Sequence, residues 1–294
     1  MARLAVDGTK SIYFEDLGGA GRALIMVHGW GMDNRCWDGV ILPLLAAGHR
    51  VITMDHRGCG RSDLDFADLS IAANAADIAQ LVDHLGLNEV VVNGWSLGGA
   101  VATHAASLLG SRCAGLILTA GASPIYTQKS DLPIGGMPAD VEGNVAAMND
   151  DRVNFLTMLA TAICAKPPTD AVLAWMASAF INSSARVSST LGELAHLDQR
   201  DMMMALETPI LSIICGQDGF VSPDISRWVA ENHPRATGVE FPDSGHAPFI
   251  EARSADNERL TKAITLLHDG WNRACSSFTT TPSQQSCSSL TPWR

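Results

Sequence analysis

The sequence predicts a doubly wound α/β fold, in which helices cover both faces of a mostly parallel sheet. Short apolar segments rich in β-branched residues recur along the chain, and helix-like stretches with a period near 3.6 residues lie between them. Short segments that are apolar throughout are typical of strands buried on both faces of a parallel sheet. The alternation of the two patterns favours parallel strands joined by crossover helices.

Six segments have the pattern of a buried strand. They are residues 23–27, 51–54, 90–92, 115–118, 210–215 and 237–241. The clearest helix is expected over residues 70–85, where Ser70 can cap the first turn and Gly86 can end the last. Further helices are expected at residues 100–109 and 255–271. These elements predict the core of the fold.

The middle of the chain has a different pattern. Residues 124–206 contain no convincing strand but many methionines and aromatic residues in helix-compatible surroundings. We therefore expect a helical cap at 124–206, inserted into a core of residues 1–123 and 207–274. Flexible methionines would suit hydrophobic acyl or alcohol groups, and ordinary packing between helices is the alternative. The tail, residues 275–294, has no apolar period and is expected to be disordered or an appended segment.

Composition excludes several classes of protein. The chain has 294 residues, of which 47% are hydrophobic, and a formal net charge of −11. It is therefore expected to be globular, with neither nucleic acid nor a membrane as a partner. Seven scattered cysteines without a C-x-x-C pair indicate neither a disulfide framework nor a zinc site. With no signal-peptide core, we expect a cytoplasmic monomer or homodimer.

The most specific motif is the run G-W-S-L-G-G at residues 94–99, which follows a predicted strand and begins a predicted helix. A G-x-S-x-G run between a strand and a helix is typical of a nucleophile elbow, a sharp turn that exposes its serine. Ser96 is therefore the candidate nucleophile. A serine hydroxyl needs a base and an orienting acid, and without them the run would be only a glycine-rich turn.

His246 and Asp218 are the candidate partners of Ser96. Both follow predicted strands, and the loops at the carboxyl ends of parallel strands meet at one edge of the sheet. The order Ser, Asp, His along the chain is that of a known catalytic triad. A histidine on an ordinary surface loop is the alternative for His246. Asp224 and Asp243 remain alternatives for the acid.

Acyl transfer also needs donors for an oxyanion. The N–H of Leu97, directly after the candidate nucleophile, is one candidate. The N–H of Trp30, in the loop H-G-W-G at residues 28–31, is the other. His28 in this loop is expected to brace it by hydrogen bonds, with a role as base as the alternative. The candidate substrate-binding residues are Trp30, Trp95, Gly29 and Phe220.

Five motifs together resemble those of α/β-hydrolase-fold proteins over about residues 10–270. They are H-G-W-G, D-H-R-G-C-G-R-S at 55–62, G-W-S-L-G-G, G-Q-D-G-F-V at 216–221 and S-G-H at 244–246. The resemblance implies an eight-stranded, mostly parallel sheet flanked by helices, with an inserted helical cap. It also implies that Asp55 and Arg57 form a loop-bracing pair. One departure is the glycine before the acid, which lies two positions upstream of Asp218 instead of three.

Within this superfamily the sequence is similar to carboxylesterases that cleave pimeloyl carrier-protein methyl ester, to cofactor-free chloroperoxidases (perhydrolases) and to enol-lactonases. A serine in the elbow favours acyl chemistry over that of relatives with an aspartate nucleophile. The expected function is therefore hydrolysis of a small, largely apolar carboxylic ester or lactone, with no metal and no cofactor. Only five lysines and arginines lie in residues 124–206, which disfavours a carrier-protein substrate. A perhydrolase or C–C lyase with the same triad, or a ligand-sensing receptor, are the alternatives.

Overall fold

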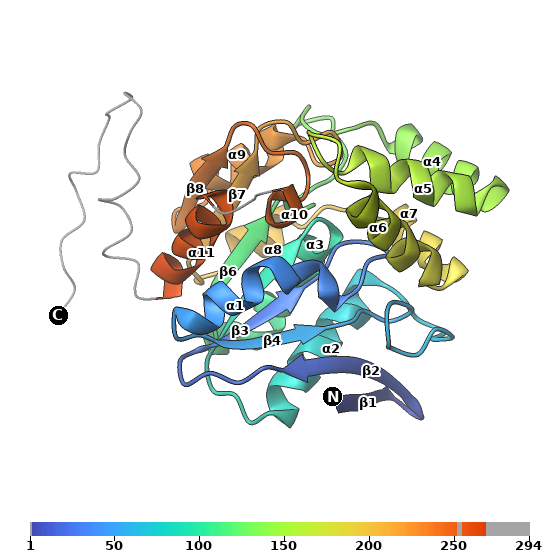
Figure 1. Cartoon of the computed structure of the whole chain (residues 1–294). Helices are drawn as coiled ribbons and strands as arrows, with labels where there is room; N and C mark the ends of the chain where they lie inside the picture. The colour runs from blue at the N-terminus through green and yellow to red at the C-terminus, as the bar shows by residue number, and fades with distance from the viewer. Residues whose placement is uncertain (1, 252–254, 269–294) are drawn as a thin grey trace.

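The computed structural model describes residues 2–251 and 255–268, in which eight strands form one sheet in the order β1-β2-β4-β3-β5-β6-β7-β8 (Figure 1). The strands are β1 (Ala2–Asp7), β2 (Lys10–Asp16), β3 (Ala23–Val27), β4 (Arg50–Met54), β5 (Val90–Trp95), β6 (Cys113–Thr119), β7 (Ile210–Cys215) and β8 (Ala236–Phe241). Strands β3 to β8 are parallel to their neighbours, whereas β2 is antiparallel to both β1 and β4. The expected eight-stranded, mostly parallel sheet is confirmed.

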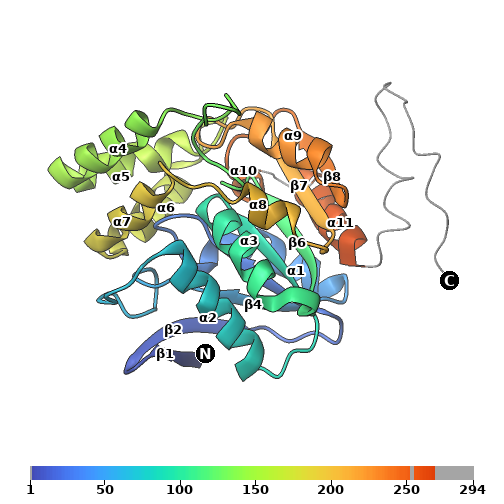
Figure 2. The ribbon, with the colours of Figure 1, turned by 180° about the vertical axis from the view of Figure 1, so that it is seen from behind.

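Helices cover both faces of the sheet. Figure 1 shows α1 (Asp38–Ala46) and α11 (Ala255–His268) on one face, and Figure 2 shows α2 (Ile71–His84) and α3 (Leu97–Leu109) on the other. Helix α9 (Pro223–Asn232) packs on β7 and β8, and the short α10 (Pro248–Glu251) precedes α11. Strands β3, β5 and β7 are buried along their whole length. This two-sided burial explains their mostly apolar sequences.

The predicted core elements are found close to their expected positions. Strands β3 and β7 have the predicted bounds, and Ser70 caps α2 by accepting a hydrogen bond from the N–H of Ala73. Helix α11 ends at His268 in the structure, and residues 269–271 of the predicted helix lie outside the described residues. The predicted disordered tail, 275–294, also lies outside them.

Two strands, β1 and β2, and three helices, α1, α9 and α10, have no counterpart among the predicted elements. Strand β1 alternates between half-buried and exposed residues, because it forms the edge of the sheet and only one of its faces packs on the protein. Strand β2 is polar at both ends and apolar only at its centre. Helix α9 is mostly polar, but Ser222 caps it and Pro223 occupies its first turn. A search for uniformly apolar segments misses such elements.

A helical insertion, residues 124–206, lies between β6 and β7. It contains α4 (Pro138–Asp150), α5 (Arg152–Ala162), α6 (Asp170–Asn182), α7 (Ser188–Glu193) and α8 (Arg200–Met204). Figure 1 shows α4 to α7 grouped beyond the carboxyl ends of the central strands. The insertion has isolated bridges but no strand. Some of its methionines are buried in the core, as Met148 and Met176 are, and others are exposed, as Met158 is.

The expectation that Asp55 and Arg57 form a pair is wrong. The guanidinium of Arg57 makes two hydrogen bonds to Asp77 on α2, at 2.6 and 2.7 Å. The carboxylate of Asp55 instead accepts hydrogen bonds from the backbone N–H groups of Asn34 and Arg61. Each residue still braces a loop. Their closeness in the motif does not identify their partners, because side chains two residues apart can point to different neighbours.

Two findings bear on the expected environment of the protein. None of the helices in the described ranges is long and apolar enough to cross a membrane. The cysteines at positions 36, 59, 113, 164 and 215 are buried and form no disulfide among themselves. Burial raises the pKa of the Cys164 thiol to about 12, so this thiol is protonated and unreactive at neutral pH.

Candidate active site

Ser96 occupies a sharp turn between β5 and α3. Its φ of 57° and ψ of −125° lie in a region that side chains other than glycine rarely adopt. Two glycines make this turn sterically possible. A Cβ on Gly94 would lie 2.1 Å from the carbonyl oxygen of Gly98, and one on Gly98 would lie 2.5 Å from that of His28. The geometry is therefore that of the predicted elbow, with Ser96 half-exposed among buried neighbours.

His246 and Asp218 are hydrogen-bonded to each other. Nδ1 of His246 lies 2.8 Å from Oδ2 of Asp218, and both side chains are almost completely buried. The other carboxylate oxygen, Oδ1, accepts hydrogen bonds from the N–H groups of Phe220 and Val221. Because an ionised carboxylate can only accept, this bond selects the tautomer of the neutral imidazole in which Nδ1 carries the proton and Nε2 is an acceptor.

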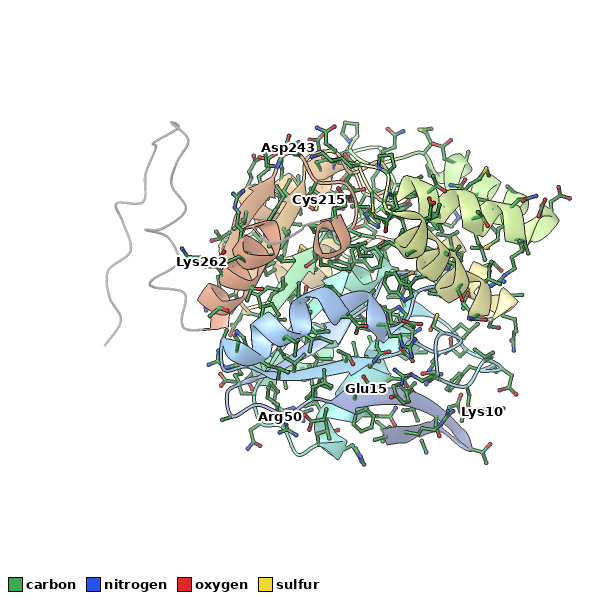
Figure 3. All side chains as sticks on the ribbon, in the orientation of Figure 1. Lys10, Glu15, Arg50, Cys215, Asp243 and Lys262 are labelled. Carbon is green, nitrogen blue, oxygen red and sulfur yellow. The ribbon has the colours of Figure 1, made fainter. Side chains whose placement is uncertain are left out.

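The other two candidate acids lie elsewhere. Asp224 is exposed in the first turn of α9 and pairs with Arg227. Asp243 is exposed at the outer surface of the loop that follows β8 (Figure 3). The structure thus brings Asp218, and neither of these carboxylates, into contact with His246.

Ser96 and His246 line one small cavity of about 60 Å³. The remaining lining residues are Trp30, Trp95, Tyr126, Leu159, Ile163, Phe180, Leu191, Leu194 and Phe220. The cavity therefore includes three of the four predicted substrate-binding residues. Gly29, the fourth, lies behind the lining, where a Cβ would be 2.8 Å from the Trp95 ring and 3.1 Å from Cβ of Ser96.

Six of the lining residues belong to the helical insertion and were not predicted. They are Tyr126, Leu159, Ile163, Phe180, Leu191 and Leu194. All but Tyr126 have side chains that are common in any protein core, so no motif distinguishes a cavity wall from core packing. None of the residues that line this cavity is a methionine, so the lining does not support the suggested role of the methionines in substrate binding.

The two predicted oxyanion donors belong to the residue after Ser96 and to the loop after the neighbouring strand β3. Leu97 is the first residue of α3, where a helix leaves its N–H groups without an intrahelical acceptor and carries a partial positive charge. Trp30 follows β3, the strand next to β5, and its indole N–H donates to the carbonyl oxygen of Val187 in the insertion. This bond fixes the loop that carries the Trp30 backbone.

His28 braces the same loop, as expected. Its Nδ1 lies 2.7 Å from the carbonyl oxygen of Gly29, and its Nε2 accepts a hydrogen bond from the N–H of His56. Burial lowers the pKa of His28 well below its usual value and lowers that of His56 to about 4, so both rings are neutral at physiological pH. With both ring nitrogens engaged, His28 is not placed to act as a base.

The backbone of His246 is held from two sides. Its carbonyl oxygen accepts a hydrogen bond from the Trp95 indole, and its N–H donates to the carbonyl oxygen of Ile163 in the insertion. Glu251, at the end of α10, links the same two segments. Oε2 of Glu251 accepts from the N–H of Gly245, and Oε1 accepts from the N–H of Ala165. The His246 loop and the insertion are thus joined directly at Ile163 and a second time through Glu251.

Glu251→Ala is expected to lower kcat/KM for an ester substrate about tenfold, because small displacements of catalytic groups are costly. It removes the acceptor for two N–H groups and should also lower the free energy of unfolding by about 1–3 kcal/mol. Steady-state kinetics and chemical denaturation measure the two effects. Glu231→Ala, at an exposed site on α9, is the matched control. Unchanged kinetics in Glu251→Ala would show that this link does not position His246.

Comparison with known proteins gives a consistent result. A family model described as alpha/beta hydrolase family matches residues 24–258. The pimeloyl-[acyl-carrier protein] methyl ester esterase of Sodalis glossinidius (strain morsitans) is 31% identical over 250 residues, which cover 82% of this chain and 92% of that protein.

Two solved structures share the fold. An esterase from Exiguobacterium antarcticum superposes with a TM-score of 0.85 at 24% identity and covers 91% of this chain and 99% of its own. The enol-lactonase from Burkholderia xenovorans LB400 has a TM-score of 0.77 at 21% identity, and the match covers 90% of this chain and 100% of that protein. At these identities the structural likeness establishes the fold alone.

Proposed function

Because the chain belongs to the alpha/beta hydrolase family, we propose that it is a serine hydrolase that cleaves small, largely apolar carboxylic esters or lactones through an acyl-enzyme intermediate. The observation that carries the proposal is the hydrogen-bonded pair of His246 and Asp218 at the cavity that contains Ser96. The elbow serine, a neutral imidazole with an accepting Nε2 and a buried carboxylate are the three groups that this chemistry needs.

The proposed reaction begins when Ser96 Oγ attacks the carbonyl carbon of the ester and Nε2 of His246 takes the hydroxyl proton. The negative charge that develops on the carbonyl oxygen is stabilised by the N–H groups of Trp30 and Leu97. His246 then donates its proton to the leaving alcohol. Water, deprotonated by the same imidazole, attacks the acyl-enzyme and releases the acid. Asp218 keeps the imidazole in the required tautomer and stabilises its protonated form.

The size and polarity of the cavity support a small, apolar substrate. Its volume of about 60 Å³ is far below the roughly 300–1,000 Å³ that encloses a drug-sized ligand. Aliphatic and aromatic side chains from the insertion cover it. We propose that residues 124–206 act as the cap and that residues 1–123 and 207–274 form the catalytic core.

A carrier protein is a less suitable substrate, because the basic residues of the insertion are mostly engaged. Arg200 pairs with Asp131 and Asp198, and Arg152 donates to the carbonyl oxygens of Ile181 and Ser183. An acidic carrier protein would need an exposed basic patch, and these two arginines are committed to local partners.

The proposal is tested with p-nitrophenyl esters of increasing acyl length, from acetate to dodecanoate. We expect kcat/KM to be highest for short acyl chains and to fall at least tenfold for the longest, because the small cavity cannot accommodate them. An alkylphosphonate should inactivate the protein and leave one adduct on Ser96, located by mass spectrometry. Activity that survives complete labelling of Ser96 would contradict the mechanism, and equal rates for all chain lengths would contradict the size limit.

A further inference from the structure

One polar group in the cavity has no place in the proposed reaction. Of the lining side chains, those of Leu159, Ile163, Phe180, Leu191, Leu194 and Phe220 are apolar. The indole N–H groups of Trp30 and Trp95 both donate to backbone carbonyl oxygens. Apart from Ser96 and His246, the hydroxyl of Tyr126 is the polar side-chain group that remains.

The hydroxyl of Tyr126 makes no hydrogen bond within the described residues. The ring packs against the core, and the side chain is only partly buried. The oxygen is not fully enclosed by protein, and the residue lines the cavity. An unpaired hydroxyl among apolar side chains is costly in free energy, so a ligand that supplies a hydrogen-bond partner for it gains binding free energy.

The charge of Asp218 determines which role the hydroxyl can take. Burial, together with a smaller effect of the nearby carboxylate of Asp218, raises the pKa of Tyr126 to about 12. The hydroxyl is therefore protonated at any physiological pH and is available as a donor. Its natural partner is an acceptor oxygen in the substrate.

The order of strands places Tyr126 on one side of Ser96. The loop with Trp30 follows β3, on one side of β5, whereas Tyr126 follows β6, on the other side. Asp218 and His246 follow β7 and β8, beyond β6 on that same side. In the proposed reaction the carbonyl oxygen points to the Trp30 side, and the leaving oxygen must face His246 to receive its proton. Tyr126 therefore lies beside the leaving half of the ester.

We propose that Tyr126 is a specificity-determining residue whose hydroxyl donates a hydrogen bond to an oxygen atom in the alcohol half of the substrate. The inference rests on the proposed esterase function. The substrate class it names is esters whose alcohol carries an ether, keto or similar acceptor oxygen a few bonds from the ester group. Lactones with an oxygen substituent on the alcohol-derived part of the ring belong to the same class.

The test compares pairs of butanoate esters in which one CH₂ of the alcohol is replaced by oxygen. The pairs are butyl with 2-methoxyethyl and pentyl with 3-methoxypropyl. Ethyl pentanoate with ethyl 3-methoxypropanoate moves the same replacement to the acyl half. Values of kcat/KM are measured by pH-stat for the wild type and Tyr126→Phe. Comparing the two proteins cancels differences in intrinsic reactivity between the esters.

Tyr126→Phe is expected to lower kcat/KM about tenfold for the preferred ether alcohol relative to its alkyl partner, and to leave the acyl pair unchanged. The chain has two tyrosines, and Tyr13→Phe, at the residue bonded to Glu15, is the matched control that should leave every ratio unchanged. Because phenylalanine retains the ring, the thermal midpoint of Tyr126→Phe should match that of the wild type.

The outcomes separate this inference from the proposed function. If alkyl esters are cleaved in a Ser96-dependent reaction but Tyr126→Phe changes both members of each alcohol pair equally, the role of Tyr126 is refuted. A changed ratio in the acyl pair alone would refute the assignment to the alcohol half. If none of the esters is cleaved through Ser96, the proposed function itself has failed.

Discussion

Ser96→Ala should lower kcat for the best ester substrate by a factor on the order of 10⁵ or more, as expected when the nucleophile of a triad is removed. The variant keeps the neutral imidazole and both candidate oxyanion donors, but no acyl-enzyme can form. Since the cavity is otherwise unchanged, KM for any residual reaction should stay within a few-fold of the wild-type value. Initial rates at high protein concentration, with the buffer rate subtracted, measure the loss.

The control for this substitution is Ser107→Ala, at an exposed serine on α3. It should retain full activity. Alanine at position 96 must adopt the same positive φ of 57°, so stability should change little, and circular dichroism can verify the fold. A Ser96→Ala variant that retains more than a tenth of wild-type kcat would mean that another group is the nucleophile.

The three candidate catalytic residues could be located in the sequence because each lies in a local pattern with a physical cause. The turn at Ser96 requires glycines where a Cβ would meet backbone at 2.1 and 2.5 Å, so the motif is visible in the sequence. Asp218 and His246 follow buried strands, and the topology of a parallel sheet brings such loops together. Contact between segments far apart in the chain follows here from the order of the strands.

The walls of the cavity could not be predicted in the same way. Leu159, Phe180 and Leu194 come from separate parts of the insertion, and an apolar side chain has the same pattern whether it faces a cavity or the core. The one sequence feature that sets Tyr126 apart is weak: the chain has only two tyrosines. Its position at the cavity depends on how the segment after β6 packs, which no local motif determines.

Charge partners were also difficult to predict. Arg57 reaches Asp77 on α2, 20 residues away, instead of the neighbouring Asp55. Glu251 joins Gly245 to Ala165, although no pattern in the sequence connects these three positions. Ionic and hydrogen-bonded contacts of this kind depend on side-chain direction after folding. The sequence therefore indicated that Asp55 and Arg57 brace loops without indicating their partners, and it gave no sign of the role of Glu251.

Asp218→Asn is expected to lower kcat about 10⁴-fold, although the two side chains have nearly the same shape. Oδ1 of Asp218 accepts hydrogen bonds from the N–H groups of Phe220 and Val221, so the amide oxygen of asparagine must occupy this position. Its NH₂ group would then take the place of Oδ2 and face Nδ1 of His246. As the amide donates, Nδ1 becomes the acceptor and the proton moves to Nε2, which can no longer deprotonate Ser96.

By this reasoning, activity is lost because the tautomer of His246 changes. A control variant can distinguish this cause from general damage to the fold. Asp224→Asn changes an exposed carboxylate paired with Arg227 and should leave kcat within twofold. Nitrogen-15 NMR of His246 should report a proton on Nδ1 in the wild type and on Nε2 in Asp218→Asn, with the folded spectrum retained in both. If kcat falls less than tenfold while the tautomer changes, Asp218 does not act through His246, and the carboxylate serves only to anchor the loop at Phe220 and Val221.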